Sequence, residues 1–269
     1  MQKLKIYKIK WIGVETMFYQ ERQKRILEYI MQKPSVSVTE LSSVFKVSTV
    51  TIRKDLNELS EKGKIERTHG GAMCLNKSSY EETEAAKESI NIESKQEIAR
   101  KALKLVEEGS TIILDAGSTT QELAKLLVEE KLKGVTVITY ALNIAYTFRQ
   151  SREYNLVMIG GQFRHGMMSF VGPYAIQMLQ GLHADKSFIG INGYTMEEGL
   201  TTPNPYEAEV KRNIVQRSKE CILLADSKKY GNICMSKVAD VSEIDALVTD
   251  SGLSEVGRQE LMDRGVRIY

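Results

Sequence analysis

Hydroxyl, carboxylate and glycine residues gather directly after an apolar segment in the middle of the chain. Asp115 ends that segment, and Gly117, Ser118, Thr119 and Thr120 follow it. Gly117 permits a tight bend, and hydroxyls together with the free amides at the start of a helix can surround an anion. The string therefore predicts an anion site. The alternative is a Ser/Thr cap that serves folding alone.

A glycine pair and an arginine follow a second apolar segment. Gly160 and Gly161 let the backbone approach a ligand closely, and Arg164 lies three residues further on. A guanidinium group can bind phosphate through two parallel hydrogen bonds. The alternative interpretation is a turn beside a surface arginine.

Two more pairs of charged residues lie where a site could use them. Glu207 and Lys211 are four residues apart at the start of a predicted helix, and Asp226 and Lys228 end another apolar segment. An i,i+4 surface pair and an ordinary polar turn are the alternatives.

Apolar segments alternate with helical patterns from residue 110 onward, and these elements must position the polar residues. The predicted strands are 111–115, 135–139, 156–159, 186–191, 221–225 and 246–249. The predicted helices are 92–109, 119–129, 142–148, 174–182, 207–218 and 255–264. Continuous apolar runs are typical of buried parallel strands, so the alternation indicates a doubly wound, mostly parallel α/β sheet. Ligands of such sheets bind beyond the carboxyl ends of the strands.

Two short helices are predicted nearer the amino terminus. Ser37 and Glu40 form an S-x-x-E capping box, so a helix should begin there. Ser48 can cap a second helix over residues 49–61. The side chains predicted to pack inward are Val38, Leu41, Val44, Phe45, Val50, Ile52, Leu56 and Leu59.

The second of these helices carries groups that suit DNA. Thr49, Thr51, Arg53, Lys54 and Asn57 project away from its apolar face. Hydroxyl, cationic and amide groups on such a helix fit the base edges and phosphates of a major groove. The alternative is the solvated charged helix of an unrelated domain.

Residues 22–71 resemble the winged helix-turn-helix of the DeoR family of bacterial transcription regulators. The specific part is the string VSTVTIRKDL at residues 47–56, followed by a wing-like IERTHGGA at residues 65–72. The resemblance implies a DNA-binding domain. The residues that we expect to contact DNA are Ser48, Thr49, Thr51, Arg53, Lys54, Asn57, Arg67 and His69.

The rest of the chain resembles the sensor domain of the same family, which is similar in fold to ribose-phosphate isomerases. The motifs that carry the likeness are DAGSTT from residue 115, the glycine pair with Arg164, Gly193, GLTT from residue 199, EAEVKR from residue 207 and ADSK from residue 225. The resemblance implies a phosphorylated sugar or related metabolite as effector. The residues that it assigns to the effector site are Asp115, Gly117, Ser118, Thr119, Thr120, Gly160, Gly161, Arg164, Glu207, Lys211, Asp226 and Lys228.

One position departs from the family's pattern. After the second strand the family often has Thr-Asn, whereas this chain has Thr139 and Tyr140, with Asn143 three residues later. A ring in place of a short amide changes both the volume of the cleft and its hydrogen bonding. The resemblance therefore defines the class of the effector and not its identity.

Length and charge fit two domains of opposite charge. The 269 residues are 42% apolar and 27% charged, as in ordinary globular proteins, and suffice for two domains of ~150 residues. The net charge of +2 hides an asymmetry, because residues 1–73 hold fourteen Lys/Arg against eight Asp/Glu and the remainder is acidic. A basic head on an acidic body suits a DNA-binding head on a sensing body. The expected division is an extension over 1–16, a DNA-binding domain over 17–73, a linker over 74–91 and a sensor domain over 92–269.

The first sixteen residues are basic but do not read as a signal peptide, because they lack a long apolar core and a cleavage site. Family members usually begin shortly before the position of Arg22, which favours a start near Met17. An over-called translation start and a basic arm that touches DNA both stay open.

Cysteine and histidine usage predicts neither disulfides nor a metal site. Cys74, Cys221 and Cys234 are scattered with no C-x-x-C, which suits a reducing cytosol, and the histidines lack ligand spacing. No run of 18 apolar residues is present, so no membrane span is expected. The pattern favours a cytoplasmic protein without a metal or cofactor.

Two functions are compatible with these features. The first is a transcription regulator, expected to be a repressor of a sugar-metabolism operon, that binds double-stranded operator DNA as a dimer or tetramer and responds to a phosphorylated sugar. The second is a sugar-phosphate isomerase with an appended DNA-binding module, in which Asp115 or Glu207 would act as general base. The complete DNA-binding head favours the first function, so we assign no catalytic residue.

Overall fold

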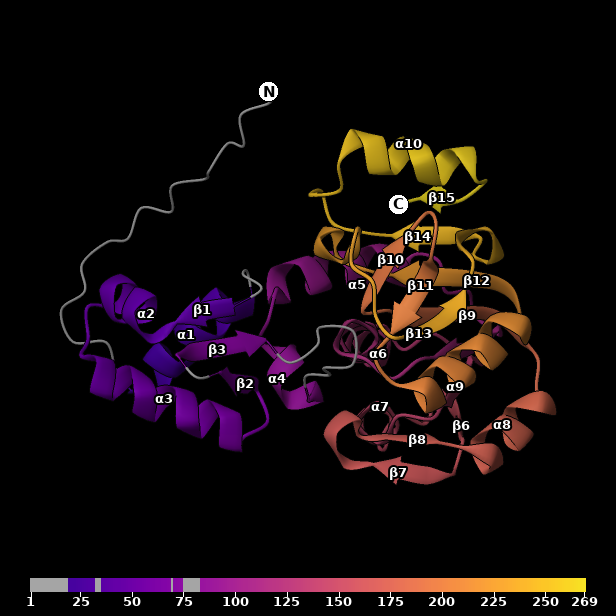
Figure 1. Cartoon of the computed structure of the whole chain (residues 1–269). Coiled ribbons are helices and arrows are strands. Elements are labelled where there is room, and N and C mark those ends of the chain that lie inside the picture. The colour runs from indigo at the N-terminus through magenta and orange to yellow at the C-terminus, as the bar shows by residue number, and fades with distance from the viewer. Residues whose placement is uncertain (1–18, 32–34, 69, 75–82) are drawn as a thin grey trace. The chain divides into compact units, whose positions relative to one another are not determined.

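The computed structural model describes residues 19–31, 35–68, 70–74 and 83–269. The chain forms two compact units, residues 1–77 and residues 78–269. Figure 1 shows the helices and strands of both units, and each unit buries an apolar core of its own.

The first unit is a winged helix-turn-helix. Its elements in chain order are α1 Tyr19–Met31, β1 Ser35–Ser37, α2 Val38–Phe45, α3 Thr49–Glu61, β2 Ile65–Thr68 and β3 Gly71–Cys74. The strands form an antiparallel sheet in the order β1-β3-β2, so β2 and β3 make the hairpin of the wing.

Side chains cap both helices of the helix-turn-helix, as predicted. The Ser37 hydroxyl accepts the Glu40 amide at 3.1 Å, and the Ser48 hydroxyl accepts the Thr51 amide at 3.1 Å. Lys46 adopts the left-handed conformation, with φ 52°, that ends α2.

Val50 was predicted to pack inward, and this prediction is wrong. Ile52, Leu56 and Leu59 are buried, whereas Val50 is 71% exposed. At 3.6 residues per turn, Val50 lies about 200° around α3 from Ile52 and therefore faces away from the core. The buried Asp55 completes the inner face of the helix in its place.

A seven-stranded parallel sheet forms the centre of the second unit. Its order is β15-β14-β12-β9-β4-β5-β6, and every neighbouring pair is parallel. The strands are β4 Thr111–Leu114, β5 Thr136–Thr139, β6 Asn155–Met158, β9 Ala184–Gly190, β12 Ser218–Leu224, β14 Ala246–Val248 and β15 Arg267–Ile268. The predicted doubly wound α/β fold is confirmed, although the two-residue β15 was not anticipated.

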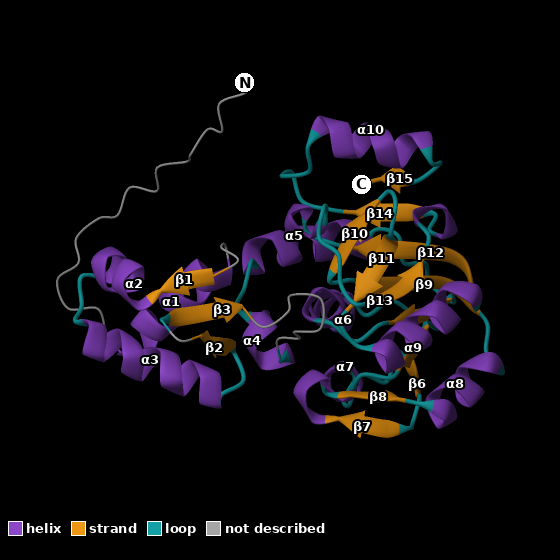
Figure 2. Ribbon diagram, in the orientation of Figure 1, coloured by secondary structure: helices purple, strands orange, loops and turns teal. Residues whose placement is uncertain are grey.

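Helices cover both faces of this sheet. Figure 2 shows α9 in front of the strands and α5 and α6 behind them. The helices are α4 Glu84–Glu88, α5 Ile92–Leu103, α6 Ser118–Glu130, α7 Leu142–Thr147, α8 Pro173–Gln180, α9 Pro205–Gln216 and α10 Glu255–Asp263, with short 3-10 turns η1 His165–Met167, η2 Ser227–Lys229 and η3 Val241–Glu243.

Two small antiparallel sheets extend the second unit. One has the order β10-β11-β13, with β10 Gly193–Thr195, β11 Gly199–Thr202 and β13 Ser236–Ala239. The other pairs β7 Gln162–Arg164 with β8 Ser169–Val171. The GLTT motif at residues 199–202 therefore lies in a strand, β11.

The order in which the chain adds strands to the main sheet reverses between β4 and β9. The chain proceeds from β4 to β5 and β6 on one side, and from β9 to β12, β14 and β15 on the other. Connections that diverge from neighbouring strands leave a crevice at their carboxyl ends. Asp115 directly follows β4 and Gly190 ends β9, so Asp115 lies at this crevice.

The segment that was expected to be a linker, residues 74–91, differs from the structure in its second half. Residues 84–88 form α4, which Thr83 caps through a 3.3 Å hydrogen bond from the Ala86 amide. This helix belongs to the second unit and packs on α6 and η1. Its polar sequence concealed it, because its buried residue is the acidic Glu84. Residues 75–82 lie outside the described residues, as does the extension over 1–16.

No helix in the described part of the chain is long and apolar enough to cross a membrane. Within the same residues, no three His, Cys, Asp or Glu side chains are grouped so that they could hold a metal ion. Cys221 is buried and Cys234 is half-buried, and both are free thiols.

Candidate functional site

The outer face of α3 presents the groups predicted to read DNA. Its exposed or half-exposed residues include Thr49, Val50, Thr51, Arg53, Lys54 and Asn57. Ser48 is also exposed, although its hydroxyl is 2.9 Å from the Thr51 hydroxyl and caps the helix. The sequence missed the apolar Val50 at the first turn of this face, because Val50 had been assigned to the core.

A buried ion pair attaches α3 to α1. Arg22 donates from Nε to Asp55 Oδ2 at 2.6 Å and from Nη2 to Asp55 Oδ1 at 3.2 Å, and the Asp55 side chain is 1% exposed. Gln23 adds a second link, because its amide donates to Glu58 at 3.0 Å and accepts from Lys62 at 3.1 Å. These bonds fix the rotation of α3, and hence which of its residues face outward.

Arg67 and His69 of the wing were also expected to contact DNA. The Arg67 guanidinium is half-buried and donates from Nη1 to the Gly71 carbonyl at 3.1 Å, so it holds the hairpin together. A Cβ at Gly71 would lie 1.9 Å from the Val36 carbonyl oxygen, so this close approach of β3 to β1 requires glycine. His69 lies outside the described residues.

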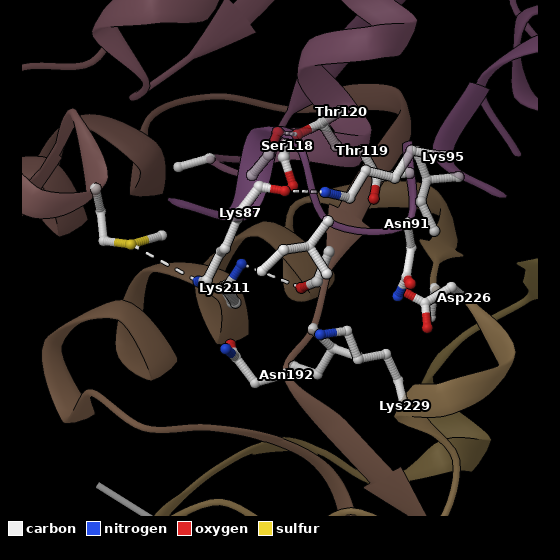
Figure 3. Close-up of a pocket in the computed structure, with 18 of the residues that line it drawn as sticks. Lys87, Asn91, Lys95, Ser118, Thr119, Thr120, Asn192, Lys211, Asp226 and Lys229 are labelled. Carbon is white, nitrogen blue, oxygen red and sulfur yellow. Dashed lines mark hydrogen bonds between the residues drawn. The ribbon is translucent and has the colours of Figure 1, made fainter. Parts of the chain in front are cut away.

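A pocket in the second unit opens at the carboxyl ends of β4, β9 and β12 (Figure 3). Its floor includes the first turn of α6, and α4, α5, α9 and η2 supply the rest of the wall. The polar residues that line it are Lys87, Asn91, Lys95, Ser118, Thr119, Thr120, Asn192, Glu207, Lys211, Asp226 and Lys229.

The first turn of α6 supplies donors for an anion. Gly117 is its N-cap, and the Thr120 hydroxyl donates to the carbonyls of Asp115 and Gly117 at 2.7 Å, which holds the turn. The amides of a helix's first turn have no acceptor within the helix, and the helix dipole favours negative charge there. The chain bends at Ala116 and Gly117, as expected, and Gly117 itself has an extended φ of 168°.

Asp115 lies beneath the pocket and is bonded on both carboxylate oxygens. Oδ1 accepts from the Tyr140 hydroxyl, while Oδ2 accepts from the Lys211 ammonium and, at 2.7 Å, from the Gly190 amide. Burial, and then the Asp115 charge, raise the pKa of Tyr140 well above its ordinary value, so its hydroxyl keeps the donated proton. Tyr140, which stands where the family often has an asparagine, thus donates a hydrogen bond to Asp115 in the network below the pocket.

The network continues through α9 to β7. Lys211 is 1% exposed and lies 3.2 Å from Glu207 Oε1, and Arg164 donates to Glu207 Oε2 at 2.8 Å. Burial lowers the pKa of Lys211, but Asp115 and Glu207 outweigh burial and raise it overall. Lys211 therefore carries a charge that its own carboxylate neighbours neutralise.

Three other lysines line the pocket, and buried carboxylates, Glu84 and Asp226, lie near them. Lys87 donates to the thioether of Met167 at 3.7 Å, a weak acceptor. Lys95 is 5% exposed and donates to the Lys87 carbonyl, and burial lowers its pKa. Lys229 lies on the opposite side beside Asp226 (Figure 3). The pocket therefore has a surplus of positive charge.

The structure brings most of the sequence-predicted effector residues together. Gly117, Ser118, Thr119, Thr120, Glu207, Lys211 and Asp226 line the pocket. Asp115 and Arg164 lie behind it, bonded to Lys211 and Glu207 respectively.

Three further predicted residues neither line the pocket nor bond to Lys211 or Glu207 behind it. Gly160 and Gly161 follow the edge strand β6, and a Cβ at Gly161 would lie 2.6 Å from the Val171 carbonyl oxygen, so this glycine serves the packing of the chain near β8. Lys228 is exposed and donates to Asn91 at 2.7 Å, whereas its neighbour Lys229 lines the pocket.

Sequence reasoning missed the side of the pocket formed by α4 and α5. Lys87, Asn91 and Lys95 had been assigned to the linker or left without a role. One signal was available, because Lys95 is in phase with Ile98 and Ala102 on the buried face of α5. A lysine on an apolar helix face is rarely buried unless it has a partner or a ligand.

Comparison with known proteins covers almost the whole chain. Residues 22–78 match the DeoR-like helix-turn-helix domain, and residues 90–251 match the DeoR C terminal sensor domain. The uncharacterized HTH-type transcriptional regulator YulB of Bacillus subtilis is 34% identical over 94% of this chain and 96% of its own. The HTH-type transcriptional regulator GolR of Listeria innocua is 36% identical over 94% and 98%.

A further relative and a solved structure complete the comparison. The transcriptional repressor AccR of Agrobacterium fabrum is 31% identical over 87% of this chain and 90% of its own. A D-ribose-5-phosphate isomerase in complex with phospho-erythronic acid matches 52% of this chain and 54% of its own at 19% identity, with a TM-score of 0.39. The two domain matches and the full-length relatives agree with the winged helix and the parallel sheet described above, and this chain belongs to the DeoR family of DNA-binding transcriptional regulators.

Proposed function

We propose that this regulator is a repressor of a sugar-metabolism operon, and that a phosphorylated sugar bound in the second unit controls its affinity for operator DNA. The observation that carries the proposal is the pairing of the α6 amino terminus with Lys87, Lys95 and Lys229 around one pocket. Helix amides together with four lysines that outnumber the two lining carboxylates, Glu207 and Asp226, favour an anion of high charge density, such as a phosphate monoester.

The remaining lining suits the sugar. Asn91, Asn192, Thr119 and Asp226 offer both donors and acceptors for hydroxyl groups. Asp115 is not available for proton abstraction, because Tyr140, Lys211 and Gly190 already donate to its two oxygens. This arrangement favours ligand sensing over isomerisation, in agreement with relatives that are named as regulators.

We assign DNA reading to the outer face of α3. Arg53, Lys54 and Asn57 extend from it without a structural bond to other described elements. Val50 supplies an apolar surface that suits a thymine methyl group. Helix-turn-helix proteins commonly bind two half-sites about 34–36 Å apart, so the repressor is expected to act as a dimer or tetramer.

Repression and release follow from linkage between the two sites. The effector favours an arrangement whose DNA-binding heads no longer fit the half-sites, with a coupling free energy of typically ~1–3 kcal/mol. The test is fluorescence anisotropy with DNA from upstream of the gene for this protein and its neighbours, at fixed salt, with a panel of sugar phosphates. Release by one panel member supports the proposal. If the protein binds the DNA specifically but no panel member changes that binding, the proposed sugar-phosphate effector is wrong. If it does not bind the DNA specifically, the proposed operator is wrong.

A further inference from the structure

The first described element after the DNA-binding unit is also part of the pocket wall. β3 ends at Cys74, and the second unit is described from Thr83, the N-cap of α4. Lys87 of α4 and Asn91 and Lys95 at the start of α5 all line the pocket. A ligand that touches these residues therefore touches the stretch of chain through which the sensor domain is joined to the winged helix.

Little apolar packing holds α4 in its position. All five of its residues are described, and the buried one among them is Glu84, which is 2% exposed. Neither carboxylate oxygen of Glu84 has a hydrogen-bond partner among the described residues. A buried carboxylate without a partner opposes the packing that buries it, and five residues are too few for a helix to be stable alone.

Lys87 and Lys95 connect α4 to the anion-binding turn. Lys95 donates to the Lys87 carbonyl, which ties the end of α4 to α5, and Figure 3 shows the Lys95 side chain beside Ser118 and Thr119. The Lys87 ammonium lines the pocket near the charge of Glu84, and among the described residues it donates a hydrogen bond to the Met167 thioether, at 3.7 Å. An anion would be a far better acceptor than a thioether.

We propose that Lys87 and Lys95 bind the anionic group of the effector opposite the first turn of α6, and that this bond holds α4 against the sensor domain and so transmits occupancy of the pocket to the DNA-binding unit. The inference rests on the proposed function, because it assumes that the pocket takes a phosphorylated effector. It adds to the proposed function the two residues, Lys87 and Lys95, that would connect ligand binding to the DNA-binding unit. By linkage, a ligand that binds only when α4 is packed must favour the packed state.

The experiment uses the full-length protein and hydrogen exchange of the amides in residues 84–95. The probes are inorganic phosphate, ribose 5-phosphate, fructose 6-phosphate, glucose 6-phosphate and glycerol 3-phosphate, with sodium chloride added to equal ionic strength. Lys87→Met is the test variant. Lys125→Met is the matched control, because Lys125 is a lysine on the exposed side of α6 whose partner is Glu122 at 2.6 Å.

Three results are distinguishable. We expect a probe that raises the melting temperature of the wild type to slow exchange in residues 84–95, and Lys87→Met to weaken that probe's affinity about tenfold, as the loss of a charged hydrogen bond does. In Lys87→Met the ratio of DNA affinities with and without saturating probe should fall towards one, while Lys125→Met should keep the wild-type ratio.

A probe that stabilises the wild type and releases DNA, but leaves exchange in residues 84–95 unchanged or acts equally on Lys87→Met, overturns this inference and leaves the proposed function standing. If no probe stabilises the protein or changes its DNA affinity, the proposed effector class is wrong and the inference fails with it.

Discussion

Arg22 on α1 and Asp55 on α3 are joined by two hydrogen bonds, of 2.6 and 3.2 Å, and the aspartate is almost completely buried. The pair places a charged residue in the middle of α3, on the face opposite to the residues that we propose to read DNA. Asp55 belongs to the same IRKDL string as Arg53 and Lys54. One short string thus contains both residues that are available to DNA and the residue that sets their direction.

Asp55→Ala should destabilise the winged helix by about 3 kcal/mol, because it leaves the Arg22 guanidinium without its buried partner. Urea unfolding followed by far-UV circular dichroism measures the effect. Glu21→Ala is the control in α1, since Glu21 pairs with Arg25 on the exposed surface and should contribute only about 0–1 kcal/mol. A double variant Arg22→Ala/Asp55→Ala whose effect equals the sum of the single variants would show that the pair is not coupled.

Arg53→Ala and Lys54→Ala should weaken operator binding while the unfolding transition stays as in the wild type, because both side chains are exposed. Loss of a base contact costs about 1–3 kcal/mol and relaxes specificity. Loss of a phosphate contact lowers, by about one, the slope of the logarithm of DNA affinity against the logarithm of salt concentration. Anisotropy titrations at several salt concentrations separate the two roles. Wild-type affinity in both variants would place DNA reading on another surface.

Val50→Ala should weaken binding to an operator that presents a thymine to α3 by about 1 kcal/mol, because apolar contact with the methyl group is lost. Replacing thymines of the operator one at a time by uracil, which lacks the methyl group, identifies the position. At that position the wild type should lose affinity and Val50→Ala should not. If every uracil substitution affects the two proteins equally, Val50 makes no methyl contact.

Lys211→Met should destabilise the sensor domain by about 3–5 kcal/mol, because it leaves Asp115 buried without its cation and leaves Glu207 with Arg164 alone. Tyr140→Phe should cost less, about 1.5–3 kcal/mol, since one donor to Asp115 is lost. Lys219→Met is the matched control, because Lys219 pairs with Asp185 but is 79% exposed. Thermal unfolding of the three variants ranks them. A melting temperature for Lys211→Met equal to that of Lys219→Met would contradict a buried network.

The packing of α4 should strengthen as the pH falls. Burial raises the pKa of Glu84 above its ordinary value. The positive charges of Lys87 and Lys95 lower this pKa, and the negative charges of Glu88 and Glu207 raise it further. A carboxyl group with a raised pKa in the packed state contributes stability that is present below its ordinary pKa of 4.5 and is lost as the pH rises through the raised value. Exchange of residues 84–91, corrected for the intrinsic pH dependence, should therefore slow between pH 7.5 and pH 5.

Glu84→Gln supplies the control for this pH dependence, because it keeps the shape of the side chain and removes its titration. The variant should show slow exchange in α4 at both pH values. The same acceleration with rising pH in Glu84→Gln as in the wild type would assign the effect to another group.

Local patterns were enough for the helix-turn-helix. Ser37 and Ser48 cap their helices because the cap and the amide that it accepts are three residues apart, a distance that the sequence displays directly. The outward direction of Arg53, Lys54 and Asn57 followed from helical periodicity in the same way. Val50 was misplaced because residue type suggested burial, whereas its angular position on α3 excludes it from the core.

The residues at the pocket were predictable to the extent that they follow strands. Parallel strands bring their carboxyl ends to one edge, so Asp115 after β4 and Asp226 after β12 were expected to meet even though their separation in the chain is large. Gly160 and Gly161 follow β6 in the same manner, but β6 is the edge strand and lies away from the point where the sheet order reverses. Strand order therefore decided which strand ends form the site.

By itself, the sequence determined that this chain has a winged helix-turn-helix and a doubly wound sheet, and which string reads as the recognition helix, because these depend on spacings of a few residues. Only the tertiary structure decided that Arg22 holds Asp55, that Tyr140 and Lys211 occupy the oxygens of Asp115, and that α4 contributes Lys87 to the pocket. In each of these contacts the two residues are far apart in the chain, and the sequence around one residue does not indicate which residue it will contact. Burial makes such partners necessary, but only the packed fold shows which ones meet.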